Sequence, residues 1–305
     1  MVTKSGFNKN FKDGTGGLRG GAGNASSGFQ SAEKRIVEAG ASVWNNSIPV
    51  TYWNFDEGTG VIANDVSSND QKLSGSLYGT SDNPSNYPTW DTTNKVRGNS
   101  SLLFDPASAQ LVTVPDKSAL DVLNFDANAS FSLSAWFKQS SGVSSDQVFM
   151  GKMTNSTETG DQQYRGYSIW VESDGNSPEF YLIDDLSPSK YLHVSGDATF
   201  DTNWHHLVVT YSGGANLASV KMYVDGDLID VSQVVDTLGT GDTTENSSDF
   251  SIGSFGLGRA GTGQFRWKGN IDECAVWNKV LVAGEVTDVY NDGDGNDLTD
   301  GIPKS

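Results

Sequence analysis

The sequence predicts an all-β protein built as an antiparallel β-sandwich, on three observations. The chain of 305 residues contains 35 Gly, 10% aromatic residues and only 19% charged residues, which suits polar turns between aromatic strands. Short apolar runs separated by turn signals recur along most of the chain, as in sandwiches and barrels. The clearest hairpin signal lies within residues 204–229.

That stretch holds two apolar runs, Leu207–Tyr211 and Val220–Val224, which are rich in β-branched and aromatic residues. Asp225-Gly226 follows directly, and this dipeptide favours a tight hairpin because both turn positions need a positive φ. We therefore expect three consecutive antiparallel strands. Alternation in the second run predicts one buried face and one outward face, with Tyr223 on the outward face.

The remaining elements share short apolar runs bounded by Gly, Asn, Asp or Ser. The predicted strands are Tyr52–Phe55, one within Val61–Tyr78, Ser101–Phe104, Gln110–Val114, Phe131–Lys138, Phe149–Met153, Tyr167–Glu172, Glu179–Asp184, Lys190–Val194, Phe250–Gly253, Phe265–Trp267 and Ile271–Trp277. We expect Ser101–Phe104 and Gln110–Val114 to form a hairpin, and Ala283–Tyr290 to form a short helix. The single cysteine, Cys274, excludes an intrachain disulfide and is predicted to be a small buried hydrophobe.

Composition divides the chain into three parts. Residues 1–49 are a basic, Gly-rich arm with helical spacing near residues 32–44, residues 50–291 are the sandwich, and residues 292–305 are an acidic tail. The arm has too few apolar residues to order by itself. It is either a linker into the first strand or a segment that anchors the protein on another subunit.

The charge and hydropathy of the chain exclude several classes of protein. A net charge of −18 argues against a nucleic-acid-binding surface. No run of 18 apolar residues occurs, so we expect no membrane insertion. The N-terminal stretch has no apolar core of a secretory signal, so we expect either a mature chain without its leader or a virion protein released by lysis, and the initial Met favours the second.

Four stretches, in order, carry a family resemblance. They are YWNFDEGTG from Tyr52, FSLSAWFK from Phe131, WHHLVVTY with KMYVDGDLI from Trp204, and GNIDECAVWNKVLVAGEV from Gly269. Together they resemble the laminin-G-like and concanavalin-A-like modules. The resemblance implies a jelly-roll sandwich over roughly residues 50 to 290. That fold carries lectins, adhesion modules, hydrolases and structural domains, so it does not by itself define a function.

Catalytic carboxylates are not evident. Hydrolases of the laminarinase type with this fold place their acids on one strand face as E-x-D-x-E, and no such motif occurs. The nearest pair, Glu179 and Asp184, is five residues apart, so in a regular strand the two side chains point to opposite faces. His205 and His206 are adjacent and match the family's core pattern, so we interpret them as structural. We therefore expect a non-enzymatic protein.

A candidate ligand site lies on three successive strands. Alternation leaves Trp170 of the first strand, Tyr181 of the second, and Tyr191 and His193 of the third on the outer sheet face. If the strands form a meander, these side chains form one aromatic patch, which is the kind of surface that binds sugars. The alternative is that loops or a neighbouring subunit cover the patch.

The resemblance also implies a calcium site at the rim, formed by the first loop and the closing strand. The matching positions are Asp65 and Asn69 with Asp272. Carboxylate and carbonyl oxygens are the ligands that calcium prefers. The alternative is that Asp65 and Asn69 form Asx turns.

These observations favour a structural, decoration or fibre protein of a virus particle, namely a phage, as the function. In this interpretation residues 1–49 attach the module to other virion proteins in an oligomer or larger assembly, and the sandwich binds host-surface polysaccharide. The alternative is a secreted, extracellular bacterial glycan-binding or adhesion module, and a glycoside hydrolase is the third choice.

Overall fold

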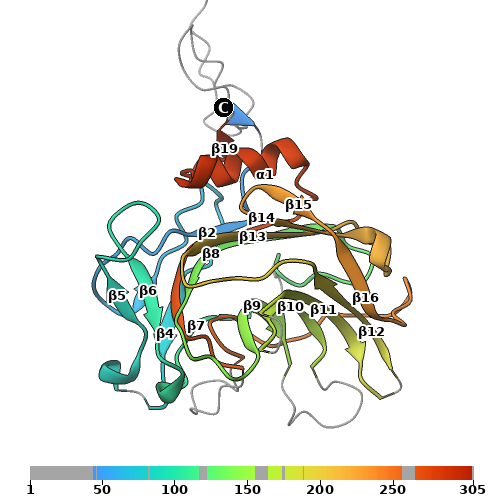
Figure 1. Ribbon diagram of the computed structural model, residues 1–305, viewed down its shortest axis with the longest axis horizontal. Coiled ribbons are helices and arrows are strands. Elements are labelled where there is room, and N and C mark those ends of the chain that lie inside the picture. Colours follow the sequence, from blue (N-terminus) through green and yellow to red (C-terminus); the bar gives the residue numbers. More distant parts are fainter. Residues whose placement is uncertain are drawn as a thin grey trace, which may run out of the picture. The chain divides into compact units, whose positions relative to one another are not determined.

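The described part of the chain is an antiparallel β-sandwich of jelly-roll type, as the sequence predicts (Figure 1). The computed structural model describes residues 44–303 except 46, 82, 117–121, 155–163, 174–175, 188 and 256–264. Residues 1–43, which hold most of the predicted arm and nearly all of its expected helix, lie outside the described residues. Within the described ranges, no helical segment has both the length and the apolar character that crossing a bilayer requires.

The larger sheet contains nine described strands. In spatial order its described strands are β16 (Val231–Asp236), β12 (Lys190–Gly196), β11 (Pro178–Asp185), β10 (Gly166–Val171), β9 (Gln147–Met153), β17 (Phe250–Ile252), β7 (Leu111–Val114), β4 (Gly75–Tyr78) and β3 (Ile62–Ala63). The strands β9 to β12 follow one another in both sequence and space, which confirms the predicted meander.

The second sheet lies against the first. In spatial order its described strands are β15 (Asp227–Ile229), β14 (Val220–Val224), β13 (Trp204–Tyr211), β8 (Phe131–Gln139), β18 (Gly269–Trp277), β6 (Ser101–Phe104) and β5 (Thr89–Asp91), with β2 (Thr51–Trp53) also paired to β18. The described helical segments are α1 (Ala283–Tyr290) and the short 3-10 turns η2 (Pro84–Asn86), η3 (Pro106–Ser108), η4 (Leu217–Ser219) and η5 (Asn291–Gly293).

Aromatic side chains fill the space between the two sheets. Phe131 is fully buried and packs on the rings of Phe125, Tyr167 and Tyr211, at centroid distances of 4.5, 5.0 and 5.4 Å. Burying rings of this size is the main favourable contribution to folding of such a sandwich. Cys274 is buried and free, as predicted.

The predicted hairpin at residues 204–229 is confirmed. β13 pairs with β14 and β14 with β15, and the turn residues Asp225 and Gly226 have φ values of 51° and 85°. One expectation is wrong. Tyr223, predicted to face outward, is only 3% exposed because the helix side of the molecule covers this face.

A second apolar layer covers the outer face of the smaller sheet. Helix α1, predicted at these residues, lies above that sheet (Figure 1) and packs Val286 and Val289 against Trp277 of β18. Residues of the predicted acidic tail belong to this layer. Its Leu298 and Ile302 are buried in the same cluster, and β19 (Ile302–Pro303) pairs with β1 (Trp44–Asn45).

The predicted hairpin between Ser101–Phe104 and Gln110–Val114 is wrong. β6 lies in the smaller sheet beside β5 and β18, whereas β7 lies in the larger sheet between β4 and β17. The short connection between them therefore crosses from one sheet to the other. Phe265–Trp267, also predicted as a strand, is an irregular segment.

Candidate functional site

The four predicted ligand residues lie on one outer face of the larger sheet. Tyr167, Ile169 and Val171 point into the core, so the intervening Trp170 points outward, and the same alternation places Tyr181 on β11. Tyr191 and His193 occupy the outer positions of β12, opposite Ile183 and Tyr181. The predicted face assignment therefore holds for all three strands.

A β-bulge lies next to this patch. Ile169 is opposite Met150 and Trp170 is opposite Val148, so Phe149 of β9 is the extra residue. Phe149 and Met150 both reach the core, and Val148 then lies on the outer face in the same cluster as Trp170. The bulge thus gives the aromatic patch an apolar base without reversing the orientation of β10.

All four residues line a single pocket of about 330 Å³. The other described residues that line it are Asp146, Met153, Tyr164, Ile183, Leu186 and Phe265. Tyr164 and Phe265 were not predicted, because they lie in irregular segments whose position depends on distant parts of the chain. Their aromatic character, next to polar loops, was the only signal that sequence offered.

The rings in the pocket have distinct roles. Trp170 is only 8% exposed and contacts Tyr181 and Phe265 at centroid distances of 5.1 and 4.3 Å, so it forms the floor. For Trp170 the alternative considered from the sequence therefore holds, because Phe265 of an irregular segment covers it. Tyr181 and Tyr191 are half-buried and supply the accessible ring surface.

Polar groups fix the orientation of the rings. His193 stacks on Tyr181 at a centroid distance of 4.0 Å, and its Nε2 atom lies 2.6 Å from a carboxylate oxygen of Glu179. Burial raises the pKa of the Tyr181 hydroxyl above its ordinary value, and the negative charges of Glu179, Glu172 and Asp146 raise it further. The hydroxyl therefore stays protonated and can donate a hydrogen bond to a ligand.

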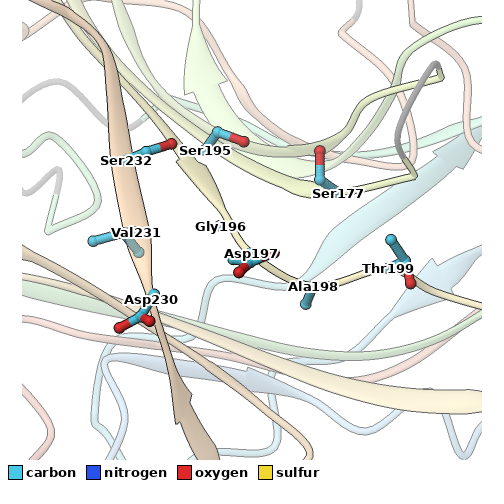
Figure 2. Close-up of a pocket in the computed structure, with 9 residues that line it drawn as sticks. All are labelled: Ser177, Ser195, Gly196, Asp197, Ala198, Thr199, Asp230, Val231 and Ser232. Atoms are coloured by element: carbon cyan, nitrogen blue, oxygen red, sulfur yellow. The ribbon is translucent and has the colours of Figure 1, made fainter.

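A larger pocket, of about 440 Å³, lies where β12 ends and β16 begins. Figure 2 shows the residues that line it, which are small or acidic and include no aromatic ring: Ser177, Ser195, Gly196, Asp197, Ala198, Thr199, Asp230, Val231 and Ser232. Its two acidic residues are exposed and joined by a backbone hydrogen bond from Asp197 N to Asp230 O of 2.8 Å. It offers no stacking surface, so the aromatic pocket is the better candidate for sugar binding.

The carboxylates considered for catalysis are held by other side chains. Asp184 forms an ion pair with Arg165 at 2.7 Å and a longer one with Lys190 at 3.5 Å. Glu179 is 2% exposed and bonded to His193. His206 stacks on Trp136, whereas His205 packs against Phe137 of the core, so the two adjacent histidines point apart.

The predicted calcium ligands have structural partners. Asp65 is buried, and its carboxylate accepts hydrogen bonds from the N–H groups of Tyr52, Ser67 and Leu73 at 3.1, 3.0 and 2.9 Å. The contact with Ser67 is the Asx turn considered as the alternative. The side-chain amide of Asn69 donates to Pro49 O and Val50 O.

Asp272 belongs to a buried acidic pair on β18. Its carboxylate accepts the N–H groups of Val96 and Glu273 at 2.9 and 3.0 Å, and Glu273 adopts a φ of 49° at a bulge against β8. The hydroxyl of Tyr52 donates to Glu273, and Arg97 lies 4.0 Å from the same carboxylate. Among the residues that the structure describes, no group of three or more His, Cys, Asp and Glu side chains could hold a metal ion.

Calcium binding by Asp65, Asn69 and Asp272 stays a prediction. A bound ion would stabilise only the native state, so excess calcium should raise the melting temperature relative to chelator. Asp272→Ala should abolish that rise. Identical melting curves with calcium and with chelator would contradict the prediction.

Comparison with known proteins agrees with this architecture. Residues 107–287, more than half of the chain, match the concanavalin A-like lectin/glucanases superfamily. The chain therefore belongs to this superfamily. A search of curated proteins returns no significant match.

Solved structures show the same fold at low sequence identity. The botulinum neurotoxin serotype C1 binding domain superposes with a TM-score of 0.52 at 14% identity, over 81% of this chain and 52% of that chain. The receptor binding domain of the botulinum neurotoxin C/D mosaic serotype gives a TM-score of 0.52 at 13% identity, with the same coverage. This chain thus spans about half the length of those neurotoxin domains. At these identities the likeness establishes the fold alone.

Proposed function

We propose that this protein is a non-enzymatic, lectin-like module of a virus particle that binds surface polysaccharide through the aromatic pocket. The observation that carries the binding part is the convergence of Trp170, Tyr181, Tyr191 and His193, from three adjacent strands, on one pocket. Aromatic faces with a few fixed polar groups suit a sugar ring, which has apolar faces and hydroxyl edges.

The arrangement of the sandwich suits a module that is attached on one side and binds its ligand on the other. The pocket lies on the outer face of the larger sheet, whereas β1, β19 and α1 cover the outer face of the smaller sheet (Figure 1). Attachment to other virion proteins through residues 1–49, which include β1, would leave the pocket facing away from the particle. Assembly into an oligomer or a larger structure is part of this proposal.

Localisation is tested on purified particles. An antibody against the sandwich should label intact virions and detect the chain at a fixed ratio to a capsid protein. Finding the chain only in particle-free culture medium would instead favour the secreted adhesion module.

Sugar binding is tested by Tyr191→Ala. Tyr191 is half-buried, so its removal should take away a stacking surface at little cost in folding stability. Loss of an aromatic anchor costs on the order of 1–3 kcal/mol, or about tenfold or more in Kd. The measurement is calorimetric titration with the polysaccharide that binds best in a glycan panel.

Tyr290→Ala is the matched control for that substitution. Tyr290 is also half-buried, but it lies at the end of α1 on the opposite side of the sandwich. Its loss should leave the affinity unchanged. Equal losses of affinity in both variants, or none in Tyr191→Ala, would show that the pocket does not bind the sugar.

A further inference from the structure

One carboxylate, Asp146, lines the aromatic pocket, and two more lie near it. Three carboxylates, Glu179, Glu172 and Asp146, lie close enough to the Tyr181 hydroxyl to disfavour its ionisation. Asp146 lines the pocket itself and is half-buried. These carboxylates repel a negatively charged ligand and attract a positively charged one.

The basic side chains at and beside the pocket pair with acids other than Asp146. His193, the basic side chain among the described residues that line the pocket, is tied to Glu179 at 2.6 Å. Beside the pocket, Arg165 pairs with Asp184 at 2.7 Å, and Lys190 pairs with Asp242 at 2.9 Å. The positive charges around the pocket are therefore already engaged with acidic partners.

The rings add to the same preference. The face of an aromatic ring carries partial negative charge and attracts a cation placed over it, most strongly for Trp. Trp170 forms the floor, and Tyr164, Tyr181, Tyr191 and Phe265 surround it. Aromatic walls combined with acidic side chains are the arrangement that desolvates and holds an ammonium group.

Two of these rings are held in a costly backbone conformation. Tyr164 and Phe265 have φ values of 58° and 54°, in the left-handed region that residues other than Gly rarely adopt. Both side chains are turned into the pocket wall. Strain of this kind at a pocket is consistent with a wall whose shape is set for a ligand.

We propose that the pocket recognises the protonated amine of an amino sugar, so that the preferred ligand is a polysaccharide containing hexosamine units with free amino groups. This inference rests on the proposed glycan-binding function and specifies the ligand. The ammonium group lies against the ring faces with Asp146 as its counter-charge, and the sugar ring stacks on the half-buried tyrosines. Acetylation of the amine removes the charge and with it the preference.

The test compares three oligosaccharides of equal length by calorimetric titration at slightly acidic pH. They are glucosamine oligomers, N-acetylglucosamine oligomers and galacturonic acid oligomers, which carry positive, no and negative charge. We expect the glucosamine oligomer to bind about tenfold or more tightly than the acetylated one, with weaker binding at high salt. The galacturonic acid oligomer should bind weakest.

Asp146→Asn tests the role of the carboxylate. Asn can still accept the hydrogen bond that Asp146 receives from Ser173 N at 3.0 Å, so the fold should be preserved. Affinity for the glucosamine oligomer should fall several-fold, and affinity for the acetylated oligomer should not change. Asp227→Asn, which removes an exposed charge from the edge strand β15 of the other sheet, is the matched control.

The outcomes separate the inference from the function on which it rests. Equal or tighter binding of the neutral or acidic oligomer would overturn the amine preference and leave glycan binding intact. Binding of none of the three oligomers, nor of any polysaccharide in the panel, would overturn both. Loss of amine selectivity in Asp227→Asn as well as in Asp146→Asn would show a non-specific effect of net charge and would also overturn the proposal.

Discussion

The protein is expected to lose stability as the pH falls from 6.5 to 3. Replacing His206 with Gln should remove much of this acid-dependent loss. His206 is fully buried, and its Nε2 atom lies 2.8 Å from Ser134 Oγ. Burial lowers the pKa of His206 to about 3, although the charge of Asp225 acts in the opposite direction. The Nδ1 atom has no hydrogen-bond partner among the described residues, so a proton there would be unsatisfied.

The direction of this pH dependence follows from the protons that the folded and unfolded states bind. The unfolded chain takes up a proton at His206 near pH 6.5 and the native state does so only near pH 3, so stability is present above 6.5 and is lost as the pH falls. The loss is at most about 1.4 kcal/mol per pH unit, or roughly 4 kcal/mol over the whole window. Denaturant unfolding of both proteins at several pH values measures the difference.

His205→Gln is the matched control because the neighbouring histidine has the opposite linkage. Its hydrogen bond to Asp225, at 2.8 Å, raises the pKa of His205 against the effect of burial. This contribution to stability is present below pH 6.5 and is lost as the pH rises through the raised value. A similar acid slope in the two variants would contradict the assignment of acid sensitivity to His206.

Glu273→Gln is expected to stabilise the protein at neutral and alkaline pH. Burial, and then the negative charge of Asp272, raise the pKa of Glu273 well above 4.5, and burial also raises the pKa of Asp272. Two carboxyls this deeply buried do not both ionise readily. Tyr52 and Arg97 favour the charged form of Glu273, but burial and the charge of Asp272 outweigh them, so Glu273 holds the proton.

The native state must keep this proton as the pH rises above 4.5, while the unfolded chain releases it. Stability from Glu273 is therefore lost between pH 4.5 and the raised pKa, at up to about 1.4 kcal/mol per pH unit. An amide does not titrate, so the advantage of Glu273→Gln should grow with pH across this window. The free energy of unfolding at pH 5 and pH 8 measures it.

Asp272→Asn is the contrasting substitution in the adjacent residue. It would place an amide group against the N–H groups of Val96 and Glu273, which Asp272 now accepts. Leaving a buried donor unpaired costs about 1–3 kcal/mol, so this variant should be less stable at every pH. A destabilised Glu273→Gln with the same pH profile as wild type would contradict the assignment of the proton.

Local alternation was sufficient to predict the aromatic site. Trp170, Tyr181 and Tyr191 lie in strands that are neighbours in sequence and in space, so the period of two residues fixes which side chains share a face. The exposure of these side chains to solvent was not predictable from alternation. Trp170 is covered by Phe265, which lies almost a hundred residues further along the chain.

The wrong predictions about the fold also arise because contacts with distant parts of the chain decide the outcome. β6 and β7 are both short and apolar and are separated by six residues, so their sequence resembles a hairpin. Their pairing is decided by strands elsewhere in the chain, because β5 and β18 flank one and β4 and β17 flank the other. Tyr223 was predicted outward for a similar reason, since strand alternation does not show that α1 covers that face.

The pairing of β1 with β19 has a mechanical consequence. Trp44 lies opposite Pro303, so tension applied between the two ends of the described chain acts first on this two-residue ladder. Antiparallel strands pulled from the paired ends open one hydrogen bond at a time, at low force. The β1–β19 pair would therefore separate first when the ends are pulled, before the force acts on the long central strands of the sandwich.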